Sequence, residues 1–250
     1  MAHSVLHSRI FFLAASICAL VFGSSATHGQ WTHRGAPEAY VRQLDFLGTP
    51  AAGTTTLIAA SLGGGMFKGV DNGSSWTWQS INNGLPTGRI WTLDAIDANT
   101  AYVGTDGSGF YKTTDGGGSW LPLNGSGATA LGCMVVKAIS ISGSTLYAGT
   151  RCRYDSGLYK STNGGITWAR IGASVIPSDV EARSIRVSGT LVFFTTANYG
   201  IFKSADSGAT WAQANSGIAG ANLDAFNTQC GTSCSALMLT YVHGQGIYKS

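Results

Sequence analysis

The chain has 250 residues, of which 11% are charged and 35 are glycine, whereas average globular proteins have about 25% charged residues and about 7% glycine. Low charge with abundant glycine is typical of short strands joined by tight turns, because glycine adopts backbone angles that other residues avoid. The net charge of +3 excludes a typical nucleic-acid-binding protein, which carries a dense basic stripe.

Residues 1–26 are predicted to form a cleaved signal peptide. Arg9 precedes the apolar run IFFLAASICALVF, and Ser24 and Ala26 are the small residues that a signal peptidase accepts before its cleavage site. The run is shorter than the ~20 apolar residues of a membrane-spanning helix. We therefore expect a secreted or periplasmic protein, with a single domain over residues 27–250 and no membrane span after cleavage.

One pattern recurs along the rest of the chain. It reads GMFKGVDNGSSW from Gly65, GFYKTTDGGGSW from Gly109, GLYKSTNGGITW from Gly157 and GIFKSADSGATW from Gly200, and its first half returns as GIYKS from Gly246. Tryptophans at positions 31, 76, 120, 168 and 211 are spaced by 45, 44, 48 and 43 residues. Periods of about 40–50 residues with short strand signals indicate four-stranded propeller blades. In the second repeat, the strands are expected over residues 89–96, 100–105, 109–114 and 119–123. We call the four strands of a repeat A to D, in chain order.

The polar residue within each pattern is predicted to shape a turn. An acid between glycines can accept hydrogen bonds from the backbone N–H groups of its own turn, and the following tryptophan is expected to anchor neighbouring blades. The amide at Asn163 supports a structural role, because an amide replaces a carboxylate as an acceptor but not as a catalytic acid. The residues concerned are Asp71, Asp115, Asn163 and Asp206, with Trp76, Trp120, Trp168 and Trp211.

The run SADSGATW from Ser204 resembles the Asp-box, or bacterial neuraminidase repeat, of sialidases, sortilin-type receptors, xyloglucanases and photosystem II stability factors. The resemblance extends from Trp31 to Ser250. It implies an all-β propeller of four-stranded antiparallel blades, with each box on a C–D turn and the ligand on the opposite face. It does not decide the activity, because these propellers include enzymes, receptors and assembly factors.

The two ends of the chain predict how the propeller closes. WTHRGAP from Trp31 matches a D strand, and GIYKS from Gly246 matches a C strand. Pairing of the N- and C-terminal strands would hide two exposed sheet edges. We therefore expect five blades, the last shared between the termini; the alternative is a fragment of a larger propeller.

Four cysteines follow the signal peptide. An even number in an exported chain favours disulfides over a zinc site. The expected positions of the strands favour the pairs Cys133–Cys152 and Cys230–Cys234. No metal or cofactor is expected.

Candidate ligand residues emerge when the A strands are aligned on Leu44, Leu93, Ile139, Ile185 and Leu223. Two residues earlier the alignment places Arg42, Trp91, Lys137, Arg183 and Ala221, and one residue later it places Asp45, Asp94, Ser140, Arg186 and Asp224. The earlier set would lie near the channel mouth and bind an anionic or sugar ligand, or alternatively cap strands and pair with carboxylates. The later set would line the channel, and we favour an inter-blade network over a cation site or an acid–base pair. Arg89 and the longest B–C loop, with Arg151, Arg153 and Tyr154, complete the candidates.

A sialidase-like enzyme would need three arginines and a tyrosine nucleophile with a nearby glutamate. Arg42, Arg89, Arg183 and Tyr154 could supply the arginines and the tyrosine, but the Arg-Ile-Pro motif is absent and the only glutamates are Glu38 and Glu181. We therefore predict a non-catalytic binding or assembly module for a carbohydrate or protein partner, without a nucleic-acid partner. A sialidase-like glycoside hydrolase is the alternative.

Overall fold

The computed structural model describes residues 40–50, 55–73 and 75–218, and the backbone of three strands beyond them. The first two sheets consist of β1 (Tyr40–Phe46), β2 (Thr56–Leu62), β3 (Met66–Asp71) and β4 (Trp76–Ser80), then β5 (Ile90–Ala95), β6 (Ala101–Thr105), β7 (Phe110–Thr113) and β8 (Leu121–Pro122). The next two consist of β9 (Val136–Ser142), β10 (Thr145–Thr150), β11 (Leu158–Ser161) and β12 (Ala169–Ile171), then β13 (Ala182–Ser188), β14 (Leu191–Thr196), β15 (Gly200–Ser204) and β16 (Ala212–Gln213). A three-stranded sheet follows, with β17 (Leu223–Asn227), β18 (Leu239–Val242) and β19 (Gly246–Lys249).

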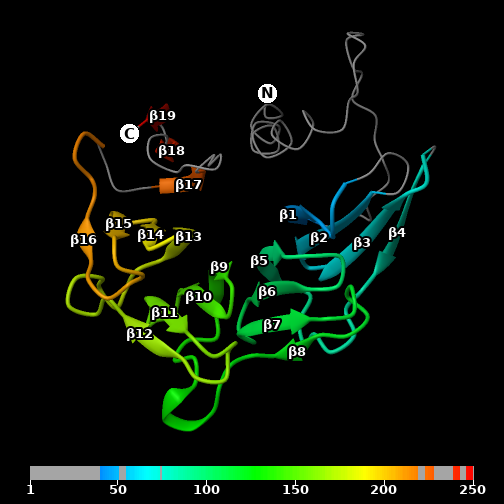
Figure 1. Cartoon of the computed structure of the whole chain (residues 1–250), viewed down its shortest axis with the longest axis horizontal. Coiled ribbons are helices and arrows are strands. Elements are labelled where there is room, and N and C mark those ends of the chain that lie inside the picture. The colour runs from blue at the N-terminus through cyan, green and yellow to red at the C-terminus, as the bar shows by residue number, and fades with distance from the viewer. Residues whose placement is uncertain are drawn as a thin grey trace, which may run out of the picture.

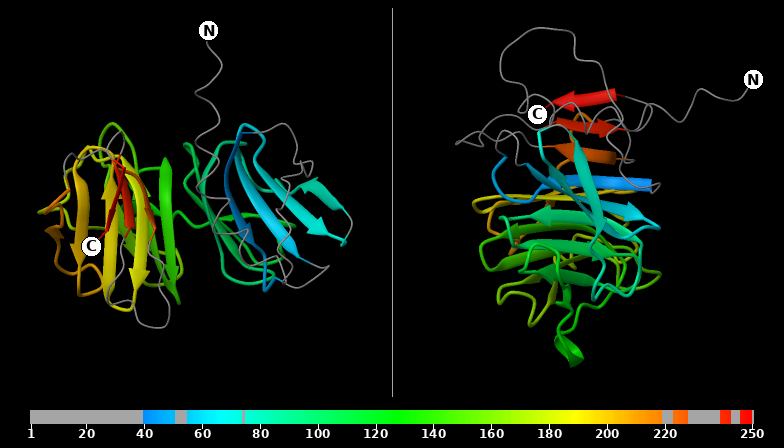
Figure 2. Two further views of the ribbon diagram at one scale, coloured as in Figure 1. Left: turned by 90° about the horizontal axis from the view of Figure 1, so that it is seen from above. Right: turned by 90° about the vertical axis from the view of Figure 1, so that its right-hand side faces the viewer.

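The sheets are arranged around a common centre (Figure 1). Within each sheet consecutive strands pair antiparallel, and the first strand lies nearest the centre (Figure 1). The innermost strands β1, β5, β9, β13 and β17 contact one another in that order, and Figure 2 shows the sheets from the side. The predicted all-β architecture of four-stranded antiparallel sheets is confirmed, and the four strands expected in the second repeat are β5 to β8.

Several sequence predictions fall outside the described residues. These are the signal peptide, the N-terminal strand from Trp31 and the Cys230–Cys234 pair. The number of blades and their closure through the termini therefore stay predictions. The described part of the chain contains no helix long and apolar enough to cross a membrane.

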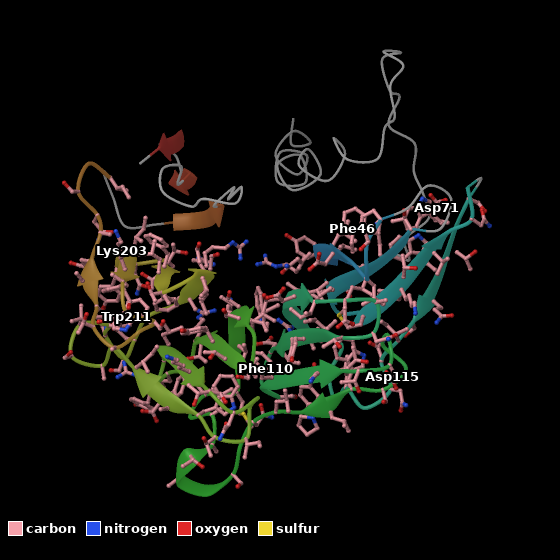
Figure 3. The ribbon with its side chains drawn as sticks, viewed as in Figure 1. Phe46, Asp71, Phe110, Asp115, Lys203 and Trp211 are labelled. Carbon is pink, nitrogen blue, oxygen red and sulfur yellow. A yellow bond between two sulfur atoms is a disulfide. The ribbon has the colours of Figure 1, made fainter. Side chains whose placement is uncertain are left out.

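Two of the repeat tryptophans join neighbouring sheets as expected. Trp120 is 1% exposed and its indole Nε1 donates to the carbonyl of Ile81, 2.8 Å away in the preceding repeat. Trp168 is likewise buried and donates to the Leu123 carbonyl at 2.7 Å. Each ring therefore contributes both apolar burial and a satisfied indole N–H at the seam between two sheets. Phe110 packs against Trp168 in the seam between the second and third sheets (Figure 3).

The acids of the repeats make the hydrogen bonds expected of turn acceptors. Asp115 Oδ1 accepts from the Thr113 hydroxyl and the Ser119 backbone N–H, at 2.7 and 2.9 Å. Asp206 binds Ser204 and Thr210 in the same way. Asn163 repeats the pattern with its amide oxygen. These turns connect the third and fourth strands, far from the centre (Figure 3), whereas the turns between the second and third strands lie at the other ends of those strands.

The first repeat departs from this geometry at Asp71. Its carboxylate accepts from the Gly73 N–H at 2.9 Å, and Asn72 rather than Asp71 accepts from the Ser75 N–H. Position 69 explains the difference, because it holds glycine where the other repeats have the hydroxyl that ties the acid to its loop. A Cβ at Gly69 would lie 2.8 Å from the Trp78 ring, which occupies that space and stacks on Trp76.

Two of the lysines that recur at one position of the repeat, Lys68 and Lys160, connect neighbouring sheets. Lys68 Nζ donates to the Gly116 carbonyl at 3.2 Å, and Lys160 Nζ donates to the Ser207 carbonyl at 2.7 Å. Both carbonyls belong to the turn of the next repeat. The ammonium groups therefore add a polar contact to the apolar seam between sheets.

Candidate functional site

A β-bulge recurs at the same place in each innermost strand. The pairing of the innermost strand with the second strand shifts register between Val41 and Gln43, between Ile90 and Thr92, and between Ala182 and Ser184. In the third sheet, Val136 and Ala138 have partners on the second strand, and Lys137 between them has none. The residues left without a cross-strand partner are Arg42, Trp91, Lys137 and Arg183. Bulges redirect side chains and are frequent near functional sites.

The fifth innermost strand corrects the sequence alignment. Its register shift lies between Leu223 and Ala225, so that Asp224 occupies the bulge position. Phe226 therefore corresponds to Leu44 and Asn227 to Asp45, whereas the sequence alignment placed Leu223 and Asp224 there. Ala221 lies outside the described residues. The alignment failed because Leu223 and Phe226 are both apolar and a bulge breaks the alternation that would distinguish them.

The four bulge side chains of the first four sheets meet in one cluster. Lys137 Nζ lies 3.4 Å from the centroid of the Trp91 ring, and Arg42 Cζ lies 4.9 Å from it. Lys137 Nζ and Arg183 Nη1 lie 3.3 and 3.2 Å from Glu181 Oε1. The sequence alignment therefore brought together residues that are neighbours in space. We call these residues, with Glu181 and Arg151, the basic cluster.

Glu181 is the central acid of the basic cluster, and sequence analysis missed this role. Arg151 Nε lies 3.3 Å from Glu181 Oε2, so that one carboxylate contacts three cations. Its position two residues before Arg183, in the loop that leads into the fourth innermost strand, was the only sequence signal available. Four cations and one carboxylate give the cluster a formal charge of +3.

The environment of Lys137 follows from this crowding. Its side chain is 6% exposed, and this burial lowers the pKa of its ammonium group. The nearby cations Arg151 and Arg183 lower the pKa further, whereas the Glu181 carboxylate raises it. Burial disfavours a charged amine, and neighbouring cations act in the same direction. A bound anion would offset both effects.

Two buried N–H groups of the basic cluster have no acceptor within the described part of the chain. They are Trp91 Nε1 and Arg183 Nε. A buried donor without a partner costs about 1–3 kcal/mol, and such groups are rare in native proteins. The polar network is therefore incomplete among the described residues.

The remaining candidates lie in the loops of the same face. Arg89 Nε is 2.6 Å from Asp106 Oδ2 and forms a separate ion pair. Arg151 joins the basic cluster and is 56% exposed. Arg153 and Tyr154 contact each other, with Arg153 Cζ 5.4 Å from the Tyr154 ring. The predicted Cys133–Cys152 disulfide is present and ties this loop to the segment before β9.

The channel-facing acids bind the neighbouring sheet, as favoured from the sequence. Asp45 Oδ2 accepts from the Ala95 N–H at 2.9 Å, and Asp94 Oδ2 accepts from the Ile141 N–H at 3.3 Å. Burial raises the pKa of Asp94 to about 6, with a further rise from Asp45, whereas the Ile141 N–H and Arg186 lower it. One carboxylate thus links β1 to β5, and another links β5 to β9. No group of three histidine, cysteine or acidic residues suited to a metal ion occurs among the described residues.

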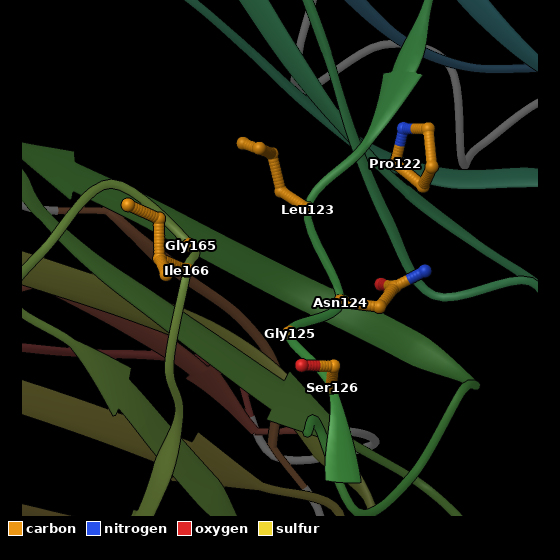
Figure 4. A pocket seen from close by; sticks show the side chains of 7 residues that line it. All are labelled: Pro122, Leu123, Asn124, Gly125, Ser126, Gly165 and Ile166. Carbon is orange, nitrogen blue, oxygen red and sulfur yellow. The ribbon is translucent and has the colours of Figure 1, made fainter. Parts of the chain in front are cut away.

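A shallow hollow of about 480 Å³ lies elsewhere, between the second and third sheets (Figure 4). Its lining is formed by Pro122, Leu123, Asn124, Gly125, Ser126, Gly165 and Ile166. None of these side chains is charged or catalytic, so the hollow offers none of the chemistry of the basic cluster.

The sialidase constellation is only partly assembled. Arg42 and Arg183 belong to the basic cluster, but Arg89 is paired with Asp106. Tyr154 is 72% exposed in its loop, and the ion pairs of Glu181 are with Lys137, Arg151 and Arg183. A buried tyrosine activated by a glutamate is not seen in the described residues.

No protein-family model matches the sequence, and no curated protein matches it. YCF48 from Cyanidioschyzon merolae has a TM-score of 0.57 and 14% identity, covering 89% of this chain and 70% of that chain. YCF48 bound to D1 peptide has a TM-score of 0.55 and 14% identity, covering 83% of this chain and 68% of that chain. A GH74 xyloglucanase from Xanthomonas campestris has a TM-score of 0.56 and 17% identity, covering 78% of this chain and 34% of that chain.

The chain is a β-propeller. It spans about a third of the length of the GH74 enzymes that it matches, and identities this low show the fold alone.

Proposed function

We propose that this chain is an exported, non-catalytic binding or assembly module that takes an anionic partner on the basic cluster. The convergence of three cations and one indole from repeated bulges, with Arg151 from a B–C loop, around a single carboxylate, carries this proposal. Arg42 and Arg151 are exposed beside the buried Lys137, so their guanidinium groups are available to a carboxylate, which guanidinium can bind through two parallel hydrogen bonds. The Cys133–Cys152 disulfide supports export, because disulfides persist in oxidising compartments.

A protein partner is favoured over a carbohydrate. Sugar-binding propellers would use a free aromatic face, but Lys137 and Arg42 lie over the Trp91 ring. The likeness to YCF48, which has been solved with a D1 peptide, supports the same choice. An acidic carbohydrate remains the second candidate, because its carboxylates offer the same chemistry.

The domain organisation is part of this proposal. Residues 27–250 would form a single domain after removal of residues 1–26, and five blades would close through the two ends of the chain. Four complete sheets followed by three further strands support it.

Binding to immobilised poly-L-glutamate, with poly-L-glutamine as the neutral control, tests the proposed function. The full chain should bind polyglutamate, and Arg151→Ala should weaken binding about fivefold through loss of one exposed charge contact. Arg89→Ala is the matched control, since it removes the same charge from the same face outside the cluster. Equal effects of the two substitutions, or no preference for polyglutamate, would contradict a specific site.

A glycan array with sialylated, other acidic and neutral sugars separates the second candidate. Acidic-glycan binding that is lost in Arg183→Ala would favour a carbohydrate ligand. Turnover of a fluorogenic sialoside would favour the sialidase-like alternative, and a blank array with intact polyglutamate binding would favour a protein partner.

A further inference from the structure

The B–C loop of the third sheet contains a three-residue insertion. In the other complete sheets, a buried hydroxyl at the end of the second strand donates to the carbonyl four residues later, as in Ser61 to Gly65, Thr105 to Gly109 and Thr196 to Gly200. Thr150 makes the equivalent bond to Gly157, seven residues later, at 3.2 Å. The base of this loop therefore has the same hydrogen bond as the other B–C loops, whereas its tip is three residues longer. Insertions in repeat proteins map to loops on one face, often the binding face.

The inserted loop is held in one conformation by several contacts. Cys152 is joined to Cys133. The buried Ser156 hydroxyl donates to the Cys152 carbonyl at 2.7 Å and accepts from the Cys152 N–H at 2.6 Å. The Tyr159 hydroxyl donates to the Asp155 carbonyl at 2.8 Å. A loop fixed in this way loses little conformational entropy when it binds.

The tip of the loop presents an aromatic ring and a cation to solvent. Tyr154 is 72% exposed, and Arg153 lies against its ring. Asp155 follows with a φ of 62°, in the left-handed region, which non-glycine residues adopt at a cost. Exposed tyrosine and arginine side chains are the residue types that most often dominate protein interfaces.

We propose that residues 152–155 form a recognition loop that inserts Tyr154 into an apolar recess of an acidic protein partner. This rests on the proposed function, because Arg151 joins the loop directly to the basic cluster. Arg151, Arg153 and the other cluster cations would face carboxylates of the partner around the recess. Among the acids near this loop, Glu181 is paired with Arg151 at 3.3 Å, and Asp179 accepts a hydrogen bond from the Tyr199 hydroxyl at 2.7 Å.

A displayed library of random dodecapeptides, selected on the full chain, provides the probe. The wild-type protein should enrich peptides in which carboxylates flank an apolar residue. The consensus peptide is then synthesised and titrated by fluorescence anisotropy. Tyr154→Ala should weaken its binding by at least about tenfold, as expected of a hot-spot residue, whereas Tyr154→Phe should retain most of the affinity.

Two controls complete this experiment. Ile166→Ala removes an apolar side chain that is 69% exposed in another loop of the same repeat, and it should leave binding unchanged. Cys133→Ser/Cys152→Ser should weaken binding because the loop loses its covalent tether, while the melting transition shows whether the fold persists.

The outcomes separate the two proposals. Peptide binding that depends on Arg151 but not on Tyr154 would overturn the recognition loop and leave the anionic site standing. The absence of any acidic–apolar consensus would also overturn the loop, and polyglutamate binding would then decide the proposed function independently. Loss of peptide binding in Tyr154→Ala together with intact polyglutamate binding is the result we expect.

Discussion

Individual polar residues divide into two groups according to what their surroundings do to them. Asp115 and Asp206 sit in turns and receive hydrogen bonds, which lower the pKa of each carboxyl to about 2, chiefly through the Thr113 and Thr210 hydroxyls respectively. Asp94 faces the centre, and burial raises the pKa of its carboxyl to about 6. The ionised form of aspartate is therefore stabilised in the turns between the third and fourth strands, and it is disfavoured on an innermost strand.

These opposite pKa shifts predict how stability depends on pH. The pKa of Asp94 is higher in the folded protein than in the unfolded chain. The stabilising contribution of its protonated carboxyl is therefore complete below the unfolded pKa near 3.8, and it is lost as pH rises through the folded pKa of about 6. The free energy of unfolding should thus increase by about 1.4 kcal/mol from pH 7.5 to pH 5. Asp94→Asn should remove most of that increase in denaturant titrations. A variant that kept the full increase would show that another group is responsible.

At lower pH, the turn acids Asp115 and Asp206 have the opposite effect on stability. Their folded pKa values are depressed, so their contribution is present above about 3.8 and is lost as pH falls towards 2. We expect maximal stability between pH 4 and about 5.5, measured as the midpoint of thermal unfolding.

Asp115 also predicts which substitution its turn tolerates. Asn163 makes the equivalent bonds to Ser161 and Thr167 with an amide, so Asp115→Asn should change the melting temperature little. Asp115→Ala leaves the Ser119 N–H and the Thr113 hydroxyl without their acceptor and should lower it clearly. Equal melting temperatures for the two variants would contradict a role as turn acceptor.

At the scale of the element, the recurring β-bulge connects the fold to its site. A regular strand alternates its side chains between two faces, whereas a bulge adds one residue and redirects it. Arg42, Trp91, Lys137 and Arg183 are those added residues. The repeat thus keeps its sheet pairing while each bulge supplies one side chain to the cluster.

The Cys133–Cys152 disulfide should stabilise the third sheet. It closes a segment of 19 residues, for which the loss of chain entropy in the unfolded state corresponds to about 3 kcal/mol. Reduction, or Cys133→Ser/Cys152→Ser, should lower the free energy of unfolding by about this amount in urea titrations. Retention of the wild-type value would indicate that the segment before β9 is ordered without the bond.

For the whole molecule, charge is concentrated rather than abundant. The chain has a net charge of only +3, so long-range attraction of an anionic partner is weak, and the basic cluster provides a local field instead. Binding of polyglutamate should weaken severalfold between 50 and about 300 mM salt, because exposed charge contacts are screened beyond about 10 Å. Arg151→Ala should reduce this salt dependence, measured as the slope of log Kd against log salt concentration, and Arg89→Ala should not.

The sequence by itself determined the β-propeller architecture, because a period of 43 to 48 residues with glycine-rich turns leaves few other ways to bury the apolar strands. It also placed Arg42, Trp91, Lys137 and Arg183 at equivalent positions of their repeats, and it paired Cys133 with Cys152. These inferences depend on local spacing, which is written directly in the chain.

Only the tertiary structure showed that the four residues occupy bulges and that Glu181 joins them. A bulge is defined by cross-strand register, and the contact between Lys137 and Glu181 joins residues 44 positions apart in different repeats. The fifth repeat was misaligned for the same reason, since apolar residues at 223 and 226 fit either register until the pairing with β18 is known. Contacts between sheets depend on how the sheets pack around the centre, and spacing along one chain does not encode that packing directly.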